Sequence, residues 1–264
     1  MKQLLVLFIV LSSVLAFTAC QTTNVSFKSY DLGQGGPVSV SGLYFEPKTK
    51  GRRPAVILLH SCGGLSQHVT QDWPEFLTEL GYVVLSVDSY TPRSIDRCHQ
   101  FKGGFAAIHT KQARDAYGAL EHLAGLPGVD PSRIAVIGFS AGANAINRWI
   151  VNRFLERKGK PTFAAAIAFY GRCHDIPIML TNTVPTLEIV AEHDTPHRPS
   201  CLQAAKYVKE LELLDIADAH HAFDSLRMRT LRIGPAGETM LYSAAATRLS
   251  EKAVQKFLAK HLGG

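Results

Sequence analysis

Short apolar runs alternate with segments of helical periodicity along most of the chain. Helical spacing is found at residues 73–80, 110–123, 141–156, 202–211 and 243–261. Continuous apolar runs, typical of strands buried on both faces, lie at residues 55–59, 82–87, 134–137, 163–170 and 186–191. Pro37–Pro47 alternates apolar and polar residues, as an edge strand or hairpin does. Strands that alternate with helices predict an α/β fold, with a mainly parallel sheet covered by helices on both faces.

The first residues have the pattern of an export signal. Lys2 precedes an apolar run that ends at Phe17, and the small residues before Cys20 suit a cleavage site. We therefore predict a signal peptide over residues 1–19, a polar tether over residues 20–36 and an α/β domain over residues 37–264.

Phe17-Thr-Ala-Cys20 resembles a bacterial lipobox, although Phe17 stands where Leu is usual. This predicts lipidation of Cys20 and attachment to a membrane on the periplasmic side. Gln21 in place of Asp favours the outer membrane. Ordinary cleavage near Ala19 and an uncleaved anchor are the alternatives.

Charge and cysteine content narrow the function classes. The formal charge of +6 is scattered, and no basic run is interleaved with aromatics, so nucleic-acid binding is not indicated. Beyond Cys20 the chain has four cysteines, which allow three disulfide pairings in an oxidising compartment: Cys62, Cys98, Cys173 and Cys201. No C-x-x-C occurs, which argues against a zinc or thiol redox centre. We expect no metal and no organic cofactor.

The most informative motif is the pentapeptide Gly138-Phe-Ser-Ala-Gly142. It lies between a predicted strand and a predicted helix, where G-x-S-x-G forms the nucleophile elbow of α/β-hydrolases. The tight turn strains the serine backbone and leaves no room for Cβ atoms at the flanking glycines. We predict that Ser140 is a nucleophile.

A serine hydroxyl needs a base, and the base needs an orienting carboxylate. In this fold the acid and then the histidine follow the serine along the chain. Asp194, directly after the strand at 186–191, is the predicted acid, with Glu192 and Asp175 as weaker candidates. His221 is the predicted base, with its neighbour His220 as the alternative.

An oxyanion hole needs two backbone N–H groups that point to one place. Ala141 follows the nucleophile and supplies the first. The loop His60-Ser-Cys-Gly-Gly64 follows the strand at 55–59, and we assign the second donor to Cys62.

These residues resemble the dienelactone hydrolase family of α/β-hydrolases. The resemblance is carried by the elbow, by segments 59–65, 81–84 and 88–93, and by Ala191-Glu-His-Asp194 and His221-Ala-Phe-Asp224. It implies hydrolysis of an ester or lactone through an acyl-enzyme on Ser140. Founding members carry Cys as the nucleophile, so Ser140 points to a more general esterase. Arg93 looks like the family's carboxylate-binding arginine, with a surface or loop-bracing arginine as the alternative.

The order of the elements also suggests how the cysteines pair. Cys98 follows the strand next to that of Cys62, and Cys173 and Cys201 follow consecutive strands. We predict the disulfides Cys62–Cys98 and Cys173–Cys201, at the edge of the sheet where the active site is expected.

The sequence thus predicts an exported serine hydrolase that acts on a small ester or lactone. A peptidase of the same fold would use the same triad, but the chain lacks a large extra domain to select peptides. A non-catalytic binding lipoprotein is the alternative from another class, because a fold alone does not fix function.

Overall fold

An eight-stranded sheet forms the centre of the computed structural model, which describes residues 22–173 and 179–263. The strand order is β1-β2-β4-β3-β5-β6-β7-β8. Strands β3 to β8 are parallel, whereas β2 is antiparallel to both β1 and β4. The strands are β1 (Thr22–Gly33), β2 (Gly36–Phe45), β3 (Arg53–Leu59), β4 (Val83–Asp88), β5 (Val129–Phe139), β6 (Ala165–Phe169), β7 (Thr186–Ala191) and β8 (Leu211–Ile216), followed by the two-residue strands β9 (Arg232–Ile233) and β10 (Thr239–Met240).

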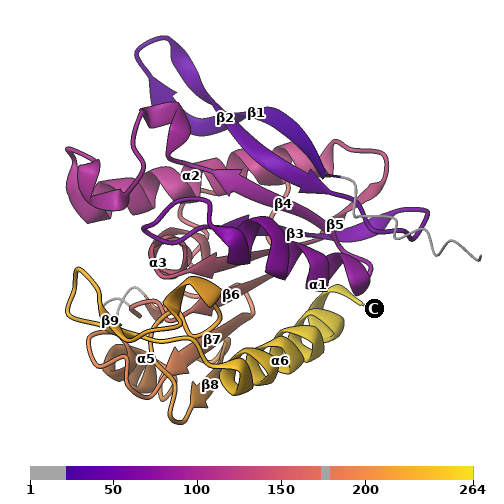
Figure 1. The fold of residues 1–264 in the computed structure, drawn as a ribbon. Helices are drawn as coiled ribbons and strands as arrows, with labels where there is room; N and C mark the ends of the chain where they lie inside the picture. Colours follow the sequence, from indigo (N-terminus) through magenta and orange to yellow (C-terminus); the bar gives the residue numbers. More distant parts are fainter. Residues whose placement is uncertain (1–21, 174–178, 264) are drawn as a thin grey trace, which may run out of the picture.

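Helices cover both faces of the sheet (Figure 1). Helices α1 (Trp73–Glu79) and α6 (Ala244–Leu262) pack on one face, and α2 (Gly104–Ala124), α3 (Ala141–Ala145) and α5 (Arg198–Ala204) on the other. Strand β3 shows why its sequence is continuously apolar, since Ile57 points into one helical layer and Leu58 into the other. The predicted α/β architecture is confirmed.

Residues 22–33 correct the prediction of a tether, because they form strand β1. The buried face of β1 consists of Phe27, Ser29 and Asp31. Its polar members are paired across to α2, where the Ser29 hydroxyl donates to Asp115 at 2.6 Å. Because Ser29 and Asp31 on the buried face are polar, this segment lacks the alternation of apolar and polar residues that indicates a strand. The folded domain therefore begins at least 15 residues before Pro37, at Thr22.

The other differences concern the lengths of two helices and the strand β8, which was not predicted. The helix predicted over residues 141–156 is the short α3, continued by a π-helical turn at Ile146–Ile150. The helix predicted over residues 202–211 is α5, which begins and ends earlier, and Leu211 opens strand β8 instead.

The predicted signal peptide and Cys20 lie outside the described residues. Among the described residues, no helix is both long enough and apolar enough to cross a bilayer.

Candidate active site

The pentapeptide at 138–142 joins the end of β5 to the start of α3. Ser140 has φ of 53° and ψ of −104°, a strained backbone for a residue with a side chain. A Cβ on Gly138 would lie 2.5 Å from the backbone of Gly142, and one on Gly142 would collide with the backbone of Leu59. The turn therefore requires glycine at both positions, as the motif predicted.

Ser140, His221 and Asp194 come together at the carboxyl ends of the strands. His221 Nε2 lies 3.0 Å from Ser140 Oγ, and His221 Nδ1 lies 2.7 Å from Asp194 Oδ2. Because a carboxylate only accepts hydrogen bonds, the partners imply that the proton is on Nδ1 and that Nε2 accepts from the serine hydroxyl. This is the arrangement that activates a serine.

Strand β10 holds the loop that carries the histidine. The His221 N–H donates to the Thr239 carbonyl at 2.9 Å, and the ring of His220 turns instead to the Thr239 hydroxyl at 2.8 Å. His221 is therefore the histidine of the pair that meets Ser140. Glu192 is exposed and accepts the N–H of Asp218, and Asp175 lies outside the described residues.

The Asp194 carboxylate is buried and accepts hydrogen bonds from two imidazoles. Its Oδ1 lies 2.7 Å from Nδ1 of His197, while Oδ2 meets His221. Burial alone raises the pKa of Asp194, but the hydrogen bonds from His197 and His221 outweigh it and lower the pKa below its ordinary value. The acid is thus held in its ionised form.

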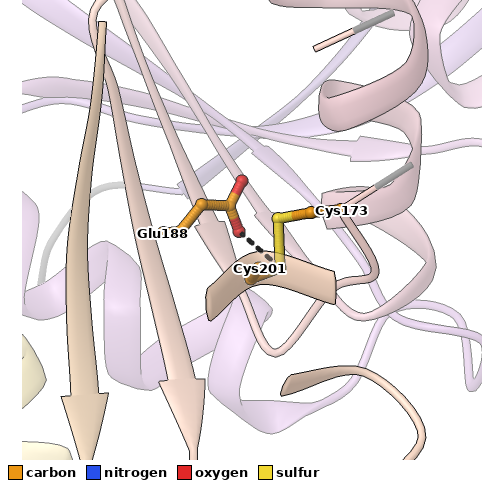
Figure 2. Close-up of side chains that lie close together, drawn as sticks. All are labelled: Cys173, Glu188 and Cys201. Atoms are coloured by element: carbon orange, nitrogen blue, oxygen red, sulfur yellow. Dashed lines mark hydrogen bonds between the residues drawn. A yellow bond between two sulfur atoms is a disulfide. The ribbon is translucent and has the colours of Figure 1, made fainter. Parts of the chain in front are cut away.

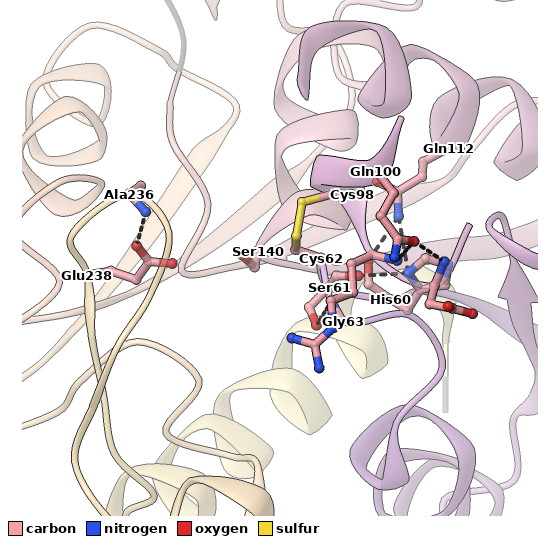
Figure 3. The surroundings of a disulfide bond; sticks show 12 residues. His60, Ser61, Cys62, Gly63, Cys98, Gln100, Gln112, Ser140, Ala236 and Glu238 are labelled. Atoms are coloured by element: carbon pink, nitrogen blue, oxygen red, sulfur yellow. Dashed lines mark hydrogen bonds between the residues drawn. A yellow bond between two sulfur atoms is a disulfide. The ribbon is translucent and has the colours of Figure 1, made fainter. Parts of the chain in front are cut away.

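The loop His60–Gly64 faces Ser140 and is held from several sides (Figure 3). His60 Nε2 accepts the Ser89 N–H at 3.2 Å, so Nδ1 carries the proton that it donates to the Ser61 carbonyl at 2.8 Å. Burial lowers the pKa of His60 and keeps it neutral in this role. The Cys62 carbonyl accepts the Cys98 N–H, and the predicted Cys62–Cys98 disulfide is present.

The two predicted oxyanion donors are Cys62 and Ala141. Cys62 lines the cavity in front of the serine, and Ala141 is the first residue of α3. N–H groups in the first turn of a helix have no partner within the helix. In the part of the chain that the structure describes, no acceptor is found for the Cys62 N–H.

Tyr170 packs against His221 and is held in place by Asp224. Neither Tyr170 nor Asp224 was assigned a role from the sequence. The Tyr170 hydroxyl donates to Asp224 at 2.7 Å, and Trp73 Nε1 donates to the other carboxylate oxygen at 2.7 Å. The Tyr170 ring lies 4.7 Å from that of His221, centroid to centroid. Tyr170 directly follows β6, so its position at a strand end was the available signal.

A cavity of about 170 Å³ opens in front of Ser140 and His221. The oxyanion loop and the segment 66–68 form one side, and residues 97–99 and 225–240 form the rest. The segment 225–240, whose role the sequence left open, is thus a wall of the cavity. Its lining residues are Ser225, Arg227, Met228, Pro235, Glu238 and Met240.

Arg93 does not line this cavity, which contradicts its predicted role in substrate binding. The guanidinium is buried and pairs with Asp31 and Asp115, each at 2.9 Å, and donates to the Ser89 carbonyl at 2.6 Å. Asp31 is on strand β1, within the segment that was predicted to be a tether. Because this segment folds as a strand, Arg93 is paired and buried. The loop-bracing alternative is correct.

The second predicted disulfide, Cys173–Cys201, is also present and ties α5 to the loop after β6. The fully buried carboxyl group of Glu188 on β7 lies beside it (Figure 2). These three residues form one of the clusters of metal-ligand types among the described residues, and Asp194 with the imidazoles of His197 and His221 forms another. In the cluster with Glu188, the two sulfurs are bonded to each other. In the cluster with Asp194, the carboxylate oxygens are hydrogen-bonded to the two imidazoles.

Fold and site together define an α/β-hydrolase. The dienelactone hydrolase family model matches residues 40–262, and the chain belongs to this family of ester hydrolases. No curated protein matches the chain.

Solved structures show the same fold at low sequence identity. The structure titled m3DLH has a TM-score of 0.72 at 19% identity, over 92% of this chain and 99% of that one. The dienelactone hydrolase-like promiscuous phosphotriesterase P91, from metagenomic libraries, has a TM-score of 0.67 at 20% identity, over 92% and 99%. A putative dipeptidyl aminopeptidase IV from Bacteroides ovatus has a TM-score of 0.65 at 17% identity, over 92% of this chain but only 36% of its own length.

Proposed function

We propose that this protein is a serine-dependent hydrolase of small carboxylic esters or lactones, which works through an acyl-enzyme on Ser140. The observation that carries the proposal is the continuous set of contacts from Ser140 Oγ through His221 to Asp194, at 3.0 Å and 2.7 Å. Ser140 and His221 line a cavity, and the chain belongs to a family of ester hydrolases.

The reaction follows from these contacts. As Ser140 Oγ attacks the acyl carbon, its proton passes to His221 Nε2, and Asp194 stabilises the imidazolium that forms. The N–H groups of Ala141 and Cys62 stabilise the negative oxygen of the tetrahedral intermediate. When the ester bond breaks, His221 returns the proton to the leaving alkoxide, which in a lactone stays attached to the acyl group. Water then attacks the acyl-enzyme by the same route and frees Ser140.

The size of the cavity favours a small substrate. Its volume of about 170 Å³ is well below the ~300–1,000 Å³ of clefts that hold drug-sized ligands. A peptidase is less well supported, because the aminopeptidase with this fold has most of its chain outside the matched part. A binding protein without activity has no need of the strained Ser140 backbone.

Labelling with a fluorophosphonate tests the proposal, because this reagent reacts with an activated serine. We expect one adduct per chain, mapped by peptide mass to Ser140, and no adduct on the Ser140→Ala variant. The cavity also contains Ser61, Ser66 and Ser225. An adduct on one of these, or labelling that survives in Ser140→Ala, contradicts the proposal.

We also propose that Cys20 carries a lipid that attaches the protein to the outer membrane. The folded domain begins at Thr22, so such an anchor would join the domain almost directly. Mass analysis of the mature N-terminus, with Cys20→Ser as the control, tests this; an unmodified mature chain would refute it.

A further inference from the structure

The acid of the triad is shared between two histidines, and the function described above uses only one of them. Each oxygen of the Asp194 carboxylate accepts one imidazole N–H at 2.7 Å, Oδ1 from His197 and Oδ2 from His221. The sequence analysis gave His197 no role. A carboxylate turns about its Cβ–Cγ bond, so a donor fixed on Oδ1 determines where Oδ2 points.

The position of His197 is itself fixed by the turn that follows β7. The N–H groups of His197 and Arg198 donate to the Asp194 carbonyl at 3.2 and 3.0 Å, which brings the ring back over the carboxylate. The Ser200 hydroxyl donates to the His197 carbonyl at 2.8 Å. The next residue, Cys201, is held by the disulfide to Cys173. The imidazole therefore stands on a braced segment and is largely buried.

Charge also favours this role. Asp194 is buried, and burial opposes its ionisation, while the hydrogen bond from His197 favours it. The His197 ring lies 5.2 Å from the His221 ring, centroid to centroid.

We propose that His197 is a positioning residue for catalysis, which holds the Asp194 carboxylate turned so that Oδ2 meets His221. The proposal rests on the proposed serine hydrolase function. The competing interpretation is structural only, since His197 also precedes α5 and a substitution there could simply weaken the helix start.

Three variants separate these interpretations. His197→Leu removes the donor, whereas His197→Asn keeps an N–H close to the place of Nδ1. His193→Leu is the matched control, because His193 is in the same turn but half-exposed and turned toward His220. For p-nitrophenyl acetate we expect His197→Leu to lower kcat by about 10–100-fold with KM within twofold, short of the ~10⁴-fold loss that follows removal of a triad's acid function. His197→Asn should recover most of kcat, and His193→Leu should match the wild type.

Proton NMR gives a readout that does not depend on turnover. We expect two low-field N–H signals in the wild type, one from each imidazole on Asp194, and the loss of one of them in His197→Leu. The proposal is overturned if His197→Leu keeps wild-type kcat, or if His197→Asn loses as much kcat as His197→Leu. If instead Ser140→Ala still hydrolyses the ester while both signals are present, the proposed function fails and the geometry at Asp194 stands.

Discussion

Replacing Glu188 by Gln should make the protein more stable, and increasingly so as the pH rises. Glu188 is on strand β7 with no exposed surface, and Oε1 has no hydrogen-bond partner among the described residues. Burial raises the pKa of its carboxyl group well above the ordinary value, against a smaller opposing hydrogen bond from Asn147. Oε2 lies 3.9 Å from Cys201 Sγ. A disulfide sulfur carries no proton, so this contact is a hydrogen bond only when the carboxyl group is protonated and donates.

The magnitude follows from proton linkage. The folded state keeps a proton that the unfolded state loses above pH 4.5, the ordinary value for Glu. The stabilising effect of the neutral carboxyl is therefore complete below that pH and is lost as the pH rises toward the raised folded pKa, at about 1.4 kcal/mol per pH unit. If Glu188 is still protonated in the folded protein at pH 7, the change between pH 5.5 and pH 7 is about 2 kcal/mol. Gln is neutral in both states and does not suffer this loss.

Urea unfolding at several pH values, without reductant, measures the effect. We expect the difference in unfolding free energy between Glu188→Gln and the wild type to grow by about 2 kcal/mol from pH 5.5 to pH 7. The control is Glu210→Gln, because Glu210 is an exposed glutamate just before β8, and its difference should stay flat. A pH-independent difference for Glu188→Gln would mean that Glu188 is ionised in the folded protein, and the reasoning would be wrong.

Two further predictions concern Arg93 and Cys98, which lie outside the lining of the cavity. Arg93→Ala should lower the unfolding free energy by about 3–5 kcal/mol, because it leaves Asp115 buried without its partner, and it should affect neutral and carboxylate-bearing esters alike; a loss confined to the carboxylate-bearing esters would restore the substrate-binding role. Cys98→Ser should lower kcat about tenfold, because it frees the loop whose Cys62 N–H is the proposed oxyanion donor, a ~1.4 kcal/mol effect; an unchanged kcat beside a lowered melting temperature would show that the disulfide serves stability only.

The sequence predicts most of what depends on local pattern. The nucleophile elbow could be predicted because the backbone passes so close to Gly138 and Gly142 that neither position has room for a Cβ. The parallel strands β3 to β7 could be predicted because both their faces are apolar, whereas β8, which has the exposed residues Glu212 and Asp215, was missed. Ser140, Asp194 and His221 follow from the chain order that the fold imposes.

Features that depend on partners across the fold were not predictable. Strand β1 buries Ser29 and Asp31, and these are acceptable inside only because Asp115 and Arg93 lie opposite. The ion pairs of Arg93 with Asp31 and Asp115 also decide the role of Arg93. His197 lies three residues after Asp194, but nothing in that spacing says that its ring turns back to the carboxylate.

The central claim is that Ser140 becomes acylated, and rapid mixing with p-nitrophenyl acetate tests it most directly. The account predicts a burst of about one p-nitrophenol per chain, a protein that gains the mass of one acetyl group on Ser140, and neither in Ser140→Ala. Turnover without a burst, without an acetylated serine in rapidly quenched samples, and undiminished in Ser140→Ala would contradict it.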